Sequence, residues 1–138
     1  MSLYLEPLSA ADMRELLAGL VPGLPDSAVS AIVARADGIP LYAVETVRTL
    51  VADGRLVEEG GIYVPRGDLT TLSVPDTLTA LIAARLDALD ETDRRIVHDA
   101  AVLGQSFSPE SLAAVSGLSQ ADLEPRLTGL ARRELLRR

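Results

Sequence analysis

The chain has 138 residues, which suits one domain or two small ones, and 48% of them are apolar, which is enough for a continuous core. The absence of cysteine excludes disulfides and thiolate metal sites, and no run of about eighteen apolar residues is present, so we expect a cytoplasmic protein that does not enter a membrane. All thirteen basic residues are arginine, which excludes a standard P-loop because that loop needs a lysine, and the net charge of −7 opposes broad binding to nucleic-acid phosphates.

Apolar residues at helical spacing predict a mainly α protein, because the core has to be built almost entirely from aliphatic side chains. The first part of the chain predicts three helices, over residues 10–20, 27–37 and 40–53. Ser9 is expected to cap the first helix and Asp26 the second. The third helix is expected to turn these aliphatic residues inward: Leu41, Val44, Val47, Leu50 and Val51.

The break between the second and third helices, residues 37–45, carries the most specific local chemistry. Gly38 is able to take the left-handed conformation that ends a helix, and Pro40 suits the first turn of the next one. The first amides of that helix lack partners within it, so the turn is able to face a polar or anionic ligand. The alternative is a purely structural corner, since glycine and proline punctuate many helical proteins.

Residues 55–65 change from helical to alternating spacing and predict a β-hairpin. Glycine supplies the positive φ of a tight hairpin turn. The predicted strands and turn are Leu56-Val57-Glu58, Ile62-Tyr63-Val64 and the intervening Glu59-Gly60-Gly61.

The polar, aperiodic stretch 66–73 is the expected boundary between two subdomains, residues 1–74 and 75–138. Pro75 is expected to begin the first helix of the second subdomain, with Arg85 off the apolar face of that helix. The expected apolar stripe is Leu78, Leu81, Ile82, Leu86 and Leu89.

Three short helices joined by tight turns are expected after that helix, within residues 91–134. Their expected N-caps are Asp90, Ser108 and Ser119. The last of them is expected to bury Leu123, Leu127, Leu130 and Ala131. This pattern predicts a helix-turn-helix or winged-helix core that ends at Arg138, before its wing.

The chain offers little catalytic or metal-binding chemistry. His98 is the only histidine and shares a helix surface with charged residues, so we expect it to be solvated rather than to act as a general base. The acidic residues 90–93 are expected to stabilise a helix start. Residues 124–138 hold five arginines against two glutamates and are expected to form a solvated helix end, with a partner-binding patch as the alternative.

Three segments together carry a family resemblance. Residues 38–45 (GIPLYAVE) have the form GxPL(F/Y)xxE at a helix start. Residues 74–78 (VPDTL) with 82–89 (IAARLDAL), and residues 100–107 (AAVLGQSF), follow in order. Over most of residues 8–136 the chain resembles the STAND class of signal-transducing AAA-type ATPases, especially the ATPase modules of bacterial multidomain regulators that carry LuxR-type DNA-binding or adenylate/guanylate cyclase domains.

The resemblance implies that residues 1–74 are a helical lid and residues 75–138 a winged-helix-like subdomain, truncated before its wing. In that family the GxP turn lies near the bound adenine nucleotide, which would place Gly38, Pro40 and Leu41 there. The Walker A loop and Walker B acid of the complete module are not found in this sequence, so we expect no ATPase activity and no cofactor here. ATP or ADP with magnesium would belong to the parent protein.

The function that the resemblance implies is a regulatory lid and coupling segment of an ATP-binding signal-transduction or transcriptional-regulator ATPase. Its partners would be the nucleotide-binding core and the output domain of the same chain. One alternative is a DNA-binding winged-helix module with the arginines of the last helix as phosphate contacts, although the acidic chain and the apolar face of that helix argue against direct DNA binding. A helical protein–protein adaptor is the other.

Overall fold

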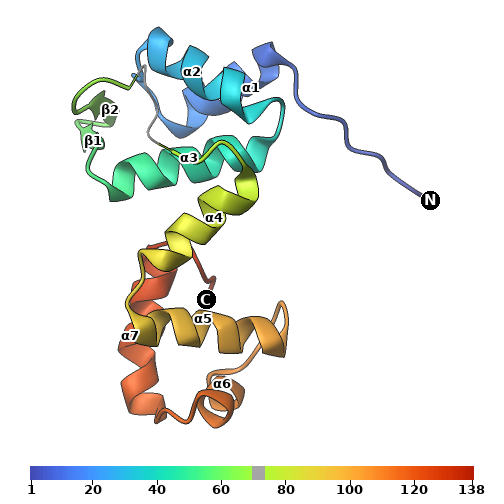
Figure 1. The fold of residues 1–138 in the computed structure, drawn as a ribbon, viewed down its shortest axis with the longest axis vertical. Coiled ribbons are helices and arrows are strands. Elements are labelled where there is room, and N and C mark those ends of the chain that lie inside the picture. The colour runs from blue at the N-terminus through green and yellow to red at the C-terminus, as the bar shows by residue number, and fades with distance from the viewer. Residues whose placement is uncertain (70–73) are drawn as a thin grey trace. The chain divides into compact units, whose positions relative to one another are not determined.

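The computed structural model describes residues 1–69 and 74–138. The chain forms two compact units, Met1–Arg85 and Leu86–Arg138. Over the described residues there are seven helices and a single two-stranded antiparallel hairpin, which confirms the mainly α prediction (Figure 1). Among these helices none has both the length and the apolar character needed to cross a membrane.

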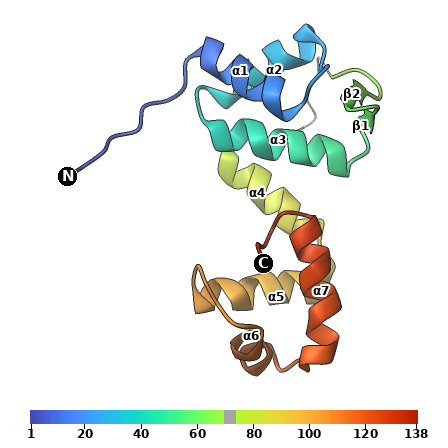
Figure 2. The ribbon, with the colours of Figure 1, turned by 180° about the vertical axis from the view of Figure 1, so that it is seen from behind.

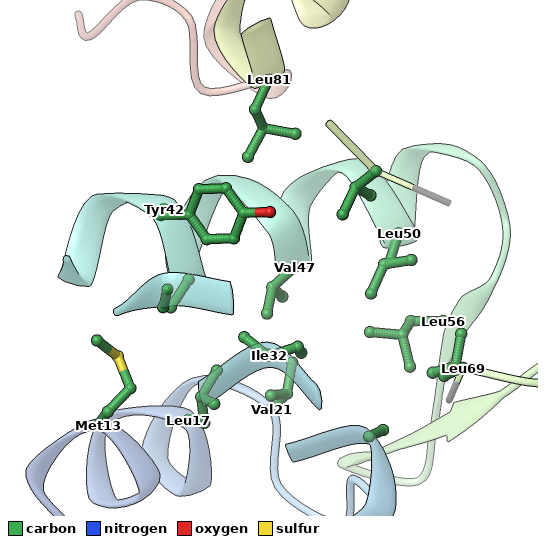
Figure 3. Close-up of a cluster of buried hydrophobic side chains, with 14 residues drawn as sticks. Met13, Leu17, Val21, Ile32, Tyr42, Val47, Leu50, Leu56, Leu69 and Leu81 are labelled. Carbon is green, nitrogen blue, oxygen red and sulfur yellow. The ribbon is translucent and has the colours of Figure 1, made fainter. Parts of the chain in front are cut away.

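In the first unit one helix lies between the others. α1 (Ala10–Leu20), α2 (Asp26–Ala36) and α3 (Pro40–Ala52) follow one another, and α4 (Leu78–Asp87) comes after the hairpin. Figure 3 shows Met13, Leu17 and Ile32 of α1 and α2 on one side of α3, and Leu81 of α4 on its other side. The core therefore wraps around α3 and is completed by Val21, Tyr42, Val47, Leu50, Leu56 and Leu69.

The helix starts follow local hydrogen bonding, with one exception. The Ser9 hydroxyl accepts a hydrogen bond from the Asp12 N–H at 3.1 Å, as predicted for an N-cap. The prediction for Asp26 was wrong: α2 already begins at Asp26, and its N-cap is Pro25, which has no side-chain acceptor. The Asp26 carboxylate instead accepts a hydrogen bond from Arg14 of α1 at 2.8 Å.

The buried face of α3 differs from the prediction. Leu41 and Val51 are exposed, not inward, so these two predictions were wrong. Tyr42 and Ala43 are buried, although they were not predicted to be. The reason is that α3 is covered on two sides, and the large Tyr42 ring fills the space facing α4.

The hairpin is confirmed. β1 (Leu56–Glu59) pairs antiparallel with β2 (Ile62–Pro65), and both turn residues, Gly60 and Gly61, have positive φ. The Tyr63 N–H donates to the Pro22 carbonyl at 2.8 Å, so the loop between α1 and α2 is hydrogen-bonded to the hairpin.

The division between the two units lies inside α4, after Arg85, whereas the sequence predicted a boundary at residues 66–73, of which 70–73 fall outside the described residues. The reason is packing: Leu81 belongs to the first core and Leu89 to the second. The helix also begins later than predicted, at Leu78 instead of Pro75, because the Thr77 hydroxyl accepts a hydrogen bond from the Ala80 N–H.

The second unit consists of α5 (Glu91–Leu103), α6 (Pro109–Ser116) and α7 (Gln120–Arg132). Both ribbon views show α7 running across α5 instead of alongside it (Figures 1 and 2). The three predicted N-caps are confirmed, since Asp90, Ser108 and Ser119 each accept from the amide three residues on. The core of this unit contains Leu89, Ile96, Ala100, Leu112, Leu123, Leu127 and Leu130.

Candidate functional site

The predicted site residues lie together at the α2–α3 turn, residues 37–41. Asp37 and Gly38 both have positive φ, of 48° and 78°, and the Ile39 N–H donates back to the Ala36 carbonyl at 2.8 Å. Pro40 occupies the first helical position of α3. One helix therefore ends and the next begins with only three residues between them, as glycine and proline at these positions predict.

Residues 39–41 of the turn form an exposed apolar surface, next to the exposed side chain of Asp37. Ile39 is 45% exposed, Leu41 is 46% exposed, and Pro40 between them is also exposed. Residues 38–41 contain no charged side chain, so this surface is suited to van der Waals contact with a flat, weakly polar group such as a base or the carbon face of a sugar. It offers no cation for a phosphate.

The inner side of the turn is covered by the segment that leads into α1. The Leu8 N–H donates to the Gly38 carbonyl at 2.8 Å. A methyl group built on Gly38 would lie 2.6 Å from Pro7 Cβ and 2.8 Å from the Leu8 carbonyl oxygen. Gly38 is thus required both by its positive φ and by the close approach of another backbone segment.

α2 and α3 also contact the segment that precedes α4, residues 74–76. The Tyr42 hydroxyl donates to the Pro75 carbonyl at 2.7 Å, and Arg35 of α2 donates to the Val74 carbonyl at 2.9 Å. Arg35 also lies 3.6 Å from the Asp76 carboxylate. Two helices of the first unit therefore hold the backbone of residues 74–76 in place.

A buried ion pair joins α3 to α4. Glu45 is only 5% exposed, and one of its carboxylate oxygens accepts from Arg48 at 2.8 Å. The other oxygen pairs with Arg85, whose side chain is 14% exposed. Arg85 was predicted to lie off the apolar face of α4 and therefore to be solvent-facing, but its side chain is mostly buried, where it pairs with the Glu45 carboxylate.

The roles of Tyr42 and Glu45 were not predicted, although the sequence carries one signal for them. Residues three apart on a helix share a face, and Tyr42 and Glu45 are polar residues at this spacing in α3. Residues 38–45 and 74–89, the two strongest parts of the family pattern, are thus hydrogen-bonded partners in the fold.

The arginine-rich end of the chain is largely engaged within the second unit. Arg126 of α7 donates to Asp93 at 2.8 Å and to Asp90 at 3.2 Å. The pKa of Asp90 is lowered, first by the Asp93 N–H and also by the Arg126 charge, while the hydrogen bond to Asp93 raises the pKa of Arg126. Arg138 pairs with Glu124 at 2.7 Å. These contacts tie α7 to α5 and to the chain end.

Two further findings concern histidine and the possible metal ligands. His98 is exposed on α5, as predicted for a solvated histidine. Over residues 1–69 and 74–138, no three His, Cys, Asp or Glu side chains are grouped so that they could hold a metal ion. Comparison of the chain with protein-family models, with curated proteins and with solved structures gave no match.

Proposed function

We propose that this chain is the regulatory lid and coupling segment of a cytoplasmic ATP-binding signal-transduction or transcriptional-regulator ATPase, acting without the catalytic core. The observation that carries the proposal is the direct linkage between the α2–α3 turn and α4. A single helix, α3, begins at the exposed turn and holds the α4 segment through Tyr42 and Glu45.

In this proposal the missing nucleotide-binding core holds the phosphates and magnesium, and the turn contacts only the base or ribose. The apolar surface of Ile39, Pro40 and Leu41 fits that limited task. A nucleotide that presses on the turn would tilt α3, and α3 would carry the change to α4. The partners are then the core and the output domain of the same protein.

Replacing Pro40 by alanine tests the proposal in the complete protein. We expect nucleotide affinity to fall by roughly three- to tenfold, because an exposed apolar contact is lost. The thermal midpoint of this segment alone should move by about 2 °C or less, since alanine is a good helix former and the restored N–H lies among first-turn amides that need no intrahelical partner. The measurements are nucleotide titration of the complete protein and thermal melting of the segment.

Pro109→Ala is the matched control, because Pro109 occupies the same first helical position in α6 of the other unit. It should leave nucleotide affinity unchanged. If Pro40→Ala also leaves affinity unchanged but lowers the melting temperature strongly, the turn is only a structural corner.

A DNA-binding module is the second candidate, favoured by the three-helix second unit and by the arginines of its last helix. Against it, Arg126 and Arg138 are held by carboxylates, and the apolar face of α7 is buried. We expect binding to random duplex DNA to be weaker than about 1 µM near physiological salt. Submicromolar binding would favour this candidate instead, if the affinity falls steeply with added salt and also falls when Arg132 is replaced by glutamine.

A further inference from the structure

The contacts of α4 with the first unit include Leu78 and Leu81, which pack on its core. Leu81 is its one fully buried residue there, and Ile82, Ala83 and Ala84 are exposed. The other deep contact is Arg85, which lies at the end of the first unit and pairs with Glu45. A helix with a single fully buried apolar side chain in its unit belongs to the less stable, more readily opened parts of a protein.

The arrangement around Glu45 is suited to release. Removing one partner of a buried ion pair is ordinarily very unfavourable, because the other charge stays buried without compensation. Here the carboxylate is shared by two arginines: Arg48 comes from the same helix, three residues on, and Arg85 comes from α4. If α4 moves away, Arg48 stays beside Glu45 and keeps its charge paired.

We propose that Glu45 is a releasable latch for α4, with Arg85 as the moving partner and Arg48 as the resident counterion that lowers the barrier to release. α4 then opens from α3 as a local unit while α1 to α3 stay folded. α4 runs from Leu78 to Asp87 and therefore extends past the division after Arg85. The role of this opening in signalling rests on the proposed function; the latch itself does not.

Amide hydrogen exchange of the whole chain tests the latch. Arg85→Met removes the moving partner and keeps a side chain of similar length, so exchange in residues 81–87 should accelerate by roughly ten- to a hundredfold. Glu45→Gln should accelerate the same amides. The double variant should show much less than the product of the two single effects, because both substitutions remove one interaction.

Arg48→Met is the matched control, since it removes the other arginine on the same carboxylate. It should leave exchange in α4 unchanged or slower, because opening would then strand Glu45 without a cation. The amides of α1 and α5 serve as internal references and should exchange at the same rate in all variants.

Three results would overturn the latch. These are unchanged exchange of α4 in Arg85→Met, equal acceleration by Arg48→Met and Arg85→Met, and acceleration throughout both units, which would indicate global destabilisation. The proposed function fails separately, if no P-loop is encoded upstream of this segment in its reading frame; that result would leave the exchange pattern of α4 unaffected.

Discussion

Substituting alanine for Gly38 is expected to lower the free energy of unfolding of the first unit by about 3 kcal/mol, the sum of left-handed strain and steric overlap. Gly38 has a φ of 78°, which costs an L-residue about 1–2 kcal/mol. The added methyl would also meet Pro7 Cβ at 2.6 Å and the Leu8 carbonyl oxygen at 2.8 Å. Either the turn or the segment leading into α1 must then move.

Gly54→Ala isolates the strain from the overlap. Gly54 follows the end of α3, has a similar φ of 71°, and a methyl built on it meets nothing within 4 Å. We expect it to cost only about 1–2 kcal/mol. If Gly38→Ala lowers the free energy of unfolding no more than Gly54→Ala does, residues 7 and 8 can move aside at no energetic cost. Their packing on the turn would then contribute nothing to stability.

Tyrosine fluorescence makes both measurements specific to the first unit. All three tyrosines, Tyr4, Tyr42 and Tyr63, lie in that unit, and the chain has no tryptophan. Tyr42 is buried, so its emission should change when the unit unfolds. Urea titrations followed by this signal therefore report the first unit, whereas circular dichroism reports the helices of both.

Leu112→Ala is expected to destabilise the second unit by about 2–5 kcal/mol and to leave the first unit unaffected. Leu112 of α6 is fully buried, and among residues 1–69 and 74–138 the core to which it belongs contains none before Leu86. Within the described part of the chain the two cores have no side chain in common, so we expect the cavity to affect only the second unit. Circular dichroism should show an early loss of helix, while the tyrosine transition stays where it is in the unaltered chain.

Leu50→Ala provides the reciprocal measurement. Leu50 is equally buried, in the first core, and its truncation should shift the tyrosine transition by a similar free energy. A tyrosine transition that moves as much with Leu112→Ala as with Leu50→Ala would contradict independent units and would indicate one cooperative fold.

The sequence by itself determined the features whose causes lie within a few residues. Ser9, Asp90, Ser108 and Ser119 each cap a helix through an amide three residues on, and Gly60-Gly61 close a two-residue hairpin. The turn at Gly38 and Pro40 follows the same logic, since its left-handed φ and first-position proline are properties of those residues. Such features were predicted because their physics is local.

The tertiary structure alone decided which face of α3 is buried and what that face does. Tyr42 reaches the Pro75 carbonyl across 33 residues of chain, and Glu45 meets Arg85 across 40. Asp26 likewise accepts a hydrogen bond from Arg14 of another helix instead of capping its own. Packing between distant residues also decides that the division between the units lies within α4. Helical periodicity marks an apolar stripe, but the partners that Tyr42 and Glu45 find across the fold are distant in the chain, and no local pattern records them.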